Sequence, residues 1–219
     1  MYEVRLLLSK QGRIKYVSHL DMFRLMQRAV RRADIPLWYT EGFNPHPYIS
    51  FLLALSLGIE GLKEPVDIRI VGEMSCEEIK ERLNAVMPEG MRVEEVYLPF
   101  NKPAEIAWGT YEVTLDKSCA SEQELFEALT SGKLTCEKSG KSGGKKIVKT
   151  VNVSEHIKSF EIDGSGDTLS LRVTLPAGSV FNLNPVQLMQ AVEGYLGKSV
   201  PVSKAVRTGL LCEDGSEFR

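Results

Sequence analysis

The sequence contains few histidines and cysteines and no long apolar run. Its 219 residues include only 3 histidines and 4 cysteines. The cysteines (Cys76, Cys119, Cys136 and Cys212) have neither the CxxC spacing of a zinc site nor the close grouping of an iron–sulfur cluster. No segment approaches the ~18 apolar residues of a membrane helix, and the apolar N-terminal stretch is too short for a secretory signal. We therefore expect a cytoplasmic protein with no metal, no cofactor and no membrane partner.

An excess of charge of one sign is also missing, since 27 Lys+Arg and 29 Asp+Glu leave a formal net charge of −2. The charges are nevertheless unevenly distributed. Residues 1–50 hold eight Lys/Arg and four acids, residues 51–105 hold six and eleven, and residues 133–149 hold six lysines and one glutamate. Because polyanions bind to local patches, the overall balance does not exclude an anionic partner. Solvated helix faces and a solvated loop are the alternative interpretation.

Common catalytic motifs are absent. The sequence has no GxSxG elbow, no paired-carboxylate motif and no dinucleotide fingerprint. Gly140-Lys141-Ser142 resembles the end of a P-loop, but Thr135 occupies the position of the required first glycine. We therefore interpret residues 138–146 as a flexible lysine-bearing loop that does not bind nucleotides.

Four capping patterns predict four helices. Ser18, Ser75 and Ser121 are each followed three residues later by an acid, and Asn184 is followed by Pro185 and Gln187. Each pattern places a side-chain oxygen over backbone N–H groups that are free at the start of a helix. We expect these helices to end near residues 34, 86, 130 and 196.

Strand-like runs separate the predicted helices. In the first half they cover residues 2–8, 13–17, 37–40, 49–57, 66–71 and 91–98. In the second half they cover residues 109–115, 146–153, 157–162, 168–175 and 203–211. Apart from extra strands, each half follows the order β-α-β-β-α-β. The pattern predicts an α+β protein of tandem ferredoxin-like (split βαβ) domains with antiparallel sheets, at residues 1–100 and 104–213, followed by a C-terminal tail at 214–219.

The first predicted helix carries a row of arginines opposite its apolar stripe. These residues are Arg24, Arg28, Arg31 and Arg32. Like charges at helical spacing weaken an isolated helix, so the row suggests an anionic group nearby. That group is either a nucleic-acid phosphate, which suits the planar guanidinium, or an acid of the protein itself, such as Asp34 or Glu41.

A proline-rich loop follows the arginine helix. Pro45 and Pro47 restrict the backbone of Asn44 and His46, and aromatic residues such as Tyr39 surround the loop. Stiff aromatic loops near arginines are typical of surfaces that bind single-stranded nucleic acid. An ordered connection whose rings fill space beside the sheet is the alternative. We predict an RNA-binding set of Arg24, Arg28, Arg31, Arg32, Tyr39, Asn44 and His46.

The signature of the N-terminal half resembles that of a known family. The segments SHLD at residues 18–21, RAVRRA at 28–33 and GFNPHP at 42–47 are similar to those of the radical-SAM-linked domain family, over about residues 1–100. Members are fused to, or encoded next to, radical S-adenosylmethionine proteins, often near a ribonuclease E/G-type protein and ribosomal protein genes. The resemblance implies an accessory or substrate-recognition module with a radical-SAM protein as partner and an RNA context.

Three functional hypotheses remain open from the sequence. The first is a non-catalytic RNA-binding module that works with a radical-SAM RNA-modifying protein. The second is a metal-independent endoribonuclease, with His19 and His46 as general base and acid, by analogy with tandem ferredoxin-like RNA-processing proteins of CRISPR systems. The third is a protein–protein adaptor whose arginines pair with an acidic partner. Catalysis by this chain alone is not indicated.

Overall fold

The chain forms two compact units in the computed structural model, which describes residues 1–142, 145–178 and 181–219. Unit 1 comprises Met1–Ile106 and Arg207–Arg219, and unit 2 comprises Ala107–Val206. The segment at 207–219 therefore belongs to unit 1, which differs from the predicted second domain at 104–213 and the predicted separate tail at 214–219. The physical reason is that Phe218 is buried against unit 1, with its ring 4.6 Å from the Arg5 guanidinium.

Unit 1 contains a mostly antiparallel sheet and two α-helices. Its elements in chain order are β1 (Tyr2–Lys10), the 3-10 helix η1 (Gly12–Tyr16), α1 (His19–Arg32), β2 (Ile49–Phe51), β3 (Glu60–Ile70), α2 (Cys76–Asn84), β4 (Met91–Tyr97) and the 3-10 helix η2 (Pro103–Glu105). The strand order is β4-β1-β3-β2, and every pair in it is antiparallel. Part of β10 (Val202–Leu211) also belongs to this unit and lies beside β3.

Unit 2 has the same arrangement with one inserted hairpin. Its elements are β5 (Trp108–Asp116), α3 (Glu122–Thr130), β6 (Thr135–Ser142), β7 (Lys145–Asn152), the 3-10 helix η3 (Ser154–His156), β8 (Ser159–Asp163), β9 (Thr168–Pro176), α4 (Pro185–Leu196) and the first part of β10. The main strand order is β10-β5-β9-β8, while β6 and β7 form a separate two-stranded sheet that projects from the unit. Both main sheets therefore place their four strands in the order fourth, first, third, second. The α+β class with antiparallel pairing is confirmed.

Each unit packs its helices against one face of its sheet. In unit 1, Val4 and Leu6 of β1 and Val66 and Ile68 of β3 share a core with Met26 of α1 and Ile79 of α2. In unit 2, the corresponding core contains Val113, Leu171, Leu125 and Leu188. The paired strand residues of unit 1 are two positions apart, so their side chains point to the same face of the sheet.

The four predicted helix starts are confirmed. The side chains of Ser18, Ser75, Ser121 and Asn184 each accept a hydrogen bond from the backbone N–H three residues later. α4 ends at Gly197 in the left-handed conformation, with φ of 66°. None of the helices in the described ranges is both long enough and apolar enough to cross a membrane.

Several strand predictions were wrong. Residues 13–17 form η1 instead of a strand, because only Ile14 in this 3-10 helix is buried and no strand pairs with it. The predicted strand at 49–57 shortens to the three residues of β2, and residues 37–40 contribute only isolated bridges at Leu37 and Tyr39. The predicted loop at 138–146 is instead paired backbone of β6 and β7, apart from residues 143–144, which lie outside the described residues.

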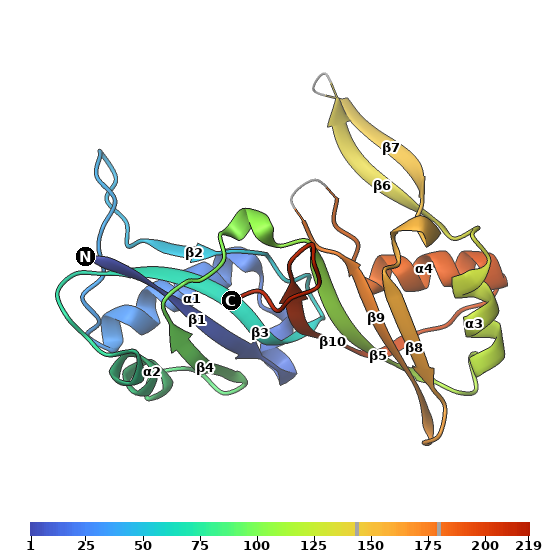
Figure 1. The fold of residues 1–219 in the computed structure, drawn as a ribbon, viewed down its shortest axis with the longest axis horizontal. Coiled ribbons are helices and arrows are strands. Elements are labelled where there is room, and N and C mark those ends of the chain that lie inside the picture. Colours follow the sequence, from blue (N-terminus) through green and yellow to red (C-terminus); the bar gives the residue numbers. More distant parts are fainter. Residues whose placement is uncertain (143–144, 179–180) are drawn as a thin grey trace. The chain divides into compact units, whose positions relative to one another are not determined.

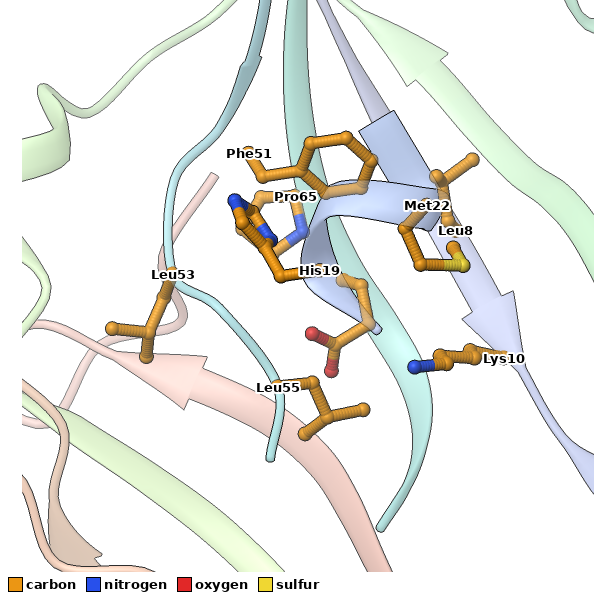
Figure 2. Close-up of a pocket in the computed structure, with 9 residues that line it drawn as sticks. Leu8, Lys10, His19, Met22, Phe51, Leu53, Leu55 and Pro65 are labelled. Carbon is orange, nitrogen blue, oxygen red and sulfur yellow. The ribbon is translucent and has the colours of Figure 1, made fainter. Parts of the chain in front are cut away.

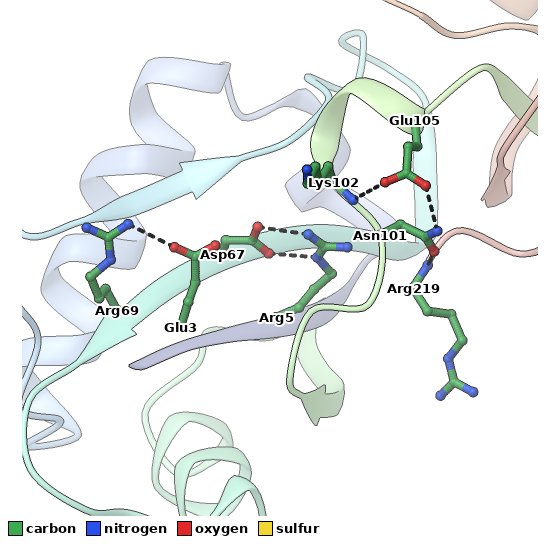
Figure 3. A network of polar contacts seen from close by, with 8 residues as sticks. All are labelled: Glu3, Arg5, Asp67, Arg69, Asn101, Lys102, Glu105 and Arg219. Atoms are coloured by element: carbon green, nitrogen blue, oxygen red, sulfur yellow. Dashed lines mark hydrogen bonds and ion pairs between the residues drawn. The ribbon is translucent and has the colours of Figure 1, made fainter. Parts of the chain in front are cut away.

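The sheet face of unit 1 opposite its helices carries a polar network (Figure 3). Arg5 and Asp67 are both buried and form two hydrogen bonds, from Nε to Oδ1 at 2.7 Å and from Nη2 to Oδ2 at 2.9 Å. Arg69 pairs with Glu3 at 3.1 Å on the same face. Burial raises the pKa of Asp67, and the pairing with Arg5 only partly offsets this effect. Charged pairs therefore occupy this face of the sheet, and the guanidinium groups of Arg5 and Arg69 also stack on aromatic rings.

Candidate nucleic-acid interface

The arginine row lies on the outer face of α1. The helix buries Met22, Met26, Ala29 and Val30 against the sheet. Residues three and four positions apart share a face of a helix, so the arginines at 24, 28, 31 and 32 project away from this stripe. All four are exposed. The local sequence thus separates an apolar inner face from a cationic outer face.

Among the described residues, one arginine of the row has an acidic partner. Arg24 pairs with Asp21 at 3.1 Å, and the pKa of Asp21 is lowered, first by the Ser18 hydroxyl and then by Arg24. In the part of the chain that the structure describes, the side chains of Arg28, Arg31 and Arg32 form no hydrogen bond or ion pair, and neither the Asp34 nor the Glu41 carboxylate pairs with them.

Two of the unpaired arginines border a groove beside α1. Its lining consists of Val17, Asp21, Leu25, Arg28, Ala29, Arg32, Val86 and Pro88, and its volume is about 480 Å³. Apolar side chains from α1 and from the turn after α2 therefore line the groove together with Arg28, Arg32 and Asp21, whose carboxylate pairs with Arg24. A groove that combines apolar side chains with two arginines suits a chain that alternates flat apolar groups with negative charges, as single-stranded nucleic acid does.

The loop between α1 and β2 projects from unit 1 (Figure 1), and hydrogen bonds join its two sides. Tyr39 and Pro47 form a backbone bridge at its base. Above this bridge, the Thr40 N–H donates to the His46 carbonyl at 2.9 Å, and the Thr40 hydroxyl lies 3.1 Å from His46 Nδ1. His46 Nδ1 also lies 3.1 Å from the Asn44 carbonyl. The prolines and these bonds together restrict the loop, as the sequence predicts.

The aromatic residues around the loop fall into two groups. Trp38 and Tyr48 lie at its base, with ring centroids 6.1 Å apart and the Arg69 guanidinium within 5.0 Å of both. Phe43 at the tip and Tyr39 below it are exposed, Phe43 completely. The alternative interpretation, in which the rings fill space beside the sheet, therefore fits Trp38 and Tyr48 at the base of the loop but not the exposed Phe43 and Tyr39. The exposure of Phe43, which was not among the predicted binding residues, becomes visible only in the structure.

The predicted site residues do not all converge. The loop contributes no residue to the groove beside α1, and among the described residues no hydrogen bond or ion pair joins Asn44 or His46 to the arginine row. His19, the first residue of α1, packs edge-on against Phe51 with centroids 5.4 Å apart. It shares no described pocket or hydrogen bond with His46, so the proposed acid–base pair is not assembled.

A second pocket in unit 1 contains residues that sequence reasoning missed. It brings Lys10 of β1 and Glu64 of β3 together with His19 (Figure 2). The two strands pair as neighbours although their residues are far apart in the sequence. No motif or spacing marks Lys10 or Glu64, so only the sheet register reveals them.

Together the fold and the surface define an α+β protein of two units with a cationic helix face on the first. The chain belongs to a family described as "Uncharacterized protein conserved in bacteria (DUF2344)", whose profile matches residues 3–185. Among curated proteins, none matches this sequence.

Solved structures show likeness of fold at low identity. A Cbf5-Nop10-Gar1 complex matches with a TM-score of 0.54 and 11% identity, over 94% of this chain and 48% of the matched chain. An archaeal box H/ACA sRNP Nop10-Cbf5 complex matches with a TM-score of 0.48 and 12% identity, over 95% and 48%. The chain therefore spans about half the length of the structures it matches, and the first likeness concerns the fold alone.

Proposed function

We propose that this protein is a cytoplasmic, non-catalytic RNA-binding module in which unit 1 holds the RNA. The exposed arginines of α1 contact phosphates, and the loop at 41–47 stacks or reads unpaired bases. Its partner is a radical-SAM RNA-modifying protein, for which it presents the substrate. Both units are ferredoxin-like, a proposal supported by the repeated strand order and by the placement of two helices on one sheet face.

The observation that carries this proposal is the unpaired state of Arg28, Arg31 and Arg32 in the described structure. Clustered guanidinium groups repel one another, and their cost is offset when an anion binds. Phosphate contacts supply most of the affinity of a sequence-tolerant RNA binder. Three such contacts predict a salt-dependence slope of roughly −2, at about −0.7 for each phosphate on a single strand.

The loop is assigned the base contacts because of its chemistry and exposure. Phe43 is fully exposed and Tyr39 is 45% exposed, while Asn44 and His46 offer hydrogen-bonding groups on the same restricted turn. Stacking of one base on an aromatic ring contributes about 1–3 kcal/mol. We therefore expect Phe43→Ala to weaken binding about 5-fold to 160-fold while the salt dependence stays unchanged.

Fluorescence anisotropy with a labelled single-stranded RNA tests the proposal. Arg28→Glu/Arg31→Glu removes two phosphate contacts and adds two repulsive charges, so binding should fall at least about 100-fold at low salt. The control variant Arg92→Glu/Arg172→Glu makes the same change in net charge at exposed positions that belong to β4 and β9 and not to α1, and it should bind like the wild type. Equal affinity of the two double variants would refute the assignment of the site.

A further inference from the structure

A small pocket in unit 1 remains unused by the proposed RNA surface. It lies between β1, β3, the start of α1 and the segment after β2, and its lining is Leu8, Lys10, His19, Met22, Phe51, Leu53, Leu55, Glu64 and Pro65. Figure 2 shows the Lys10 amine directed toward the space that Leu55 and His19 border, and Glu64 belongs to the same lining. The space open to a water-sized probe is about 30 Å³, which is room for only a few atoms.

Lys10 is the unusual residue of this pocket. It is only 5% exposed, and its amine donates one hydrogen bond, to the Val17 carbonyl at 3.1 Å. Among the described residues, no carboxylate lies within ion-pair distance of its Nζ. A buried ammonium without a close counter-charge is costly, so burial shifts the balance toward the neutral amine.

The two charged groups nearest to Lys10, Glu64 and Arg207, act on its pKa in opposite directions. Glu64 is engaged by Arg207, whose Nε donates to Oε1 at 2.9 Å and whose Nη2 contacts Oε2. Arg207 also donates to the Leu53 carbonyl at 3.0 Å. The pKa of Lys10 is lowered, first by burial and further by Arg207, while Glu64 acts in the opposite direction. The carboxylate is therefore largely committed to Arg207 and only partly supports a charge on Lys10.

The same groups restrict the chemistry of a ligand. The Glu64 carboxylate disfavours an anion in the pocket, and Arg207 together with any ammonium form of Lys10 disfavours a cation. The remaining walls are apolar, and the free space accommodates only a few atoms. A small neutral molecule with a polarised bond satisfies these conditions, and a carbonyl is the group with which a neutral amine reacts.

We propose that Lys10 is a nucleophilic amine that condenses with a small aldehyde or ketone in this pocket. The Nζ lone pair forms a bond to the carbonyl carbon, and the carbonyl π electrons move to oxygen, which takes up a proton. Loss of water from this carbinolamine forms the C=N bond of an imine, and the two hydrogens of the amine leave with the water. The step needs no oxidant, no reductant and no further co-reactant. It is independent of RNA binding, because the pocket shares no residue with the groove beside α1.

Reductive trapping tests the reactivity of Lys10. The folded full-length protein is incubated at neutral pH with acetaldehyde and cyanoborohydride, and the modified lysines are quantified by peptide mass spectrometry. Lys133, which is exposed and has no ion pair in the described structure, is the internal reference. We expect Lys10 to be alkylated faster than Lys133, because a lowered pKa increases the fraction of free amine at neutral pH. Alkylation of Lys10 at or below the rate of Lys133 would overturn the proposal.

Two variants distinguish reaction inside the pocket from general accessibility. Leu55→Trp adds bulk at the half-buried wall and should slow the alkylation of Lys10 at least about tenfold, with Lys133 unaffected. Leu57→Trp, at an exposed position outside the pocket, is the matched control and should leave both rates unchanged. If Leu55→Trp fails to fold by circular dichroism, Leu53→Phe replaces it. An unchanged Lys10 rate in a folded pocket variant would also overturn the proposal.

Discussion

The buried pair of Arg5 and Asp67 permits a sharp test of how unit 1 is stabilised. Both side chains are almost completely buried, and the guanidinium lies 4.6 Å from the Phe218 ring. Arg5 Nη1 has no hydrogen-bond partner in the described structure, so even the intact pair leaves one donor unsatisfied. We therefore expect the removal of one partner to lower the free energy of unfolding strongly, and the replacement of both partners by apolar residues to change it little.

The magnitudes follow from desolvation. Asp67→Ala leaves the Arg5 cation buried without a counter-ion, and such losses cost about 3–5 kcal/mol in the free energy of unfolding. Arg5→Met leaves an acid that can be neutralised by protonation, because burial already raises the pKa of Asp67, so its cost should be smaller and should decrease as the pH is lowered. The double variant Arg5→Met/Asp67→Leu replaces the pair by apolar groups and should lie within about 1 kcal/mol of the wild type.

Urea unfolding followed by tryptophan fluorescence can measure these values for each unit. The chain has 2 tryptophans, Trp38 in unit 1 and Trp108 in unit 2. In a Trp108→Phe background the signal reports unit 1, and in a Trp38→Phe background it reports unit 2. The reasoning would be refuted if the double variant lost the sum of the two single losses, or if Asp67→Ala cost less than about 1 kcal/mol.

Two further predictions concern stability in other parts of the chain. Lys198 and the N-terminal cap at Ser121 lower the pKa of Glu124 from 4.5 to about 2, so its contribution is complete above pH 4.5 and is lost as the pH falls through about 2. In an NMR titration, Lys198→Ala should move the midpoint of Glu124 up toward 4.5, and an unchanged midpoint would contradict the assigned cause. Gly90 has φ of 82°, and a Cβ there would lie 2.5 Å from the Gln11 carbonyl oxygen. Gly90→Ala should therefore lower the free energy of unfolding of unit 1 by about 1–3 kcal/mol, which shifts the urea midpoint to a lower concentration. An unchanged midpoint would contradict the inference that this position is strained.

Local patterns predict much of this fold because their causes are local. A serine followed by an acid three residues later satisfies backbone N–H groups at the start of α1, α2 and α3 whatever the surroundings. The arginine row is equally predictable, since helical spacing alone places Arg28, Arg31 and Arg32 on one face. The strand predicted at residues 13–17 was wrong because a strand also needs a partner strand, and this segment forms η1 instead.

Features that depend on which strands pair in the sheet could not be predicted from the sequence. Lys10 and Glu64 meet because β1 and β3 are neighbours, and nothing near either residue marks it. The C-terminal segment could not be assigned to unit 1 from the sequence, because the burial of Phe218 depends on Arg5 at the other end of the chain. Likewise, the sequence does not show that the groove beside α1 is lined without any residue of the loop at 41–47.

The most direct test of the central claim is the salt dependence of RNA binding. The observed association constant is measured against salt concentration for the wild type and for Arg28→Gln/Arg31→Gln/Arg32→Gln. If these three arginines contact phosphates, the slope of log K against log salt should become less negative by about 2 in the variant. Identical slopes for the two proteins would contradict the proposal that α1 binds the RNA backbone.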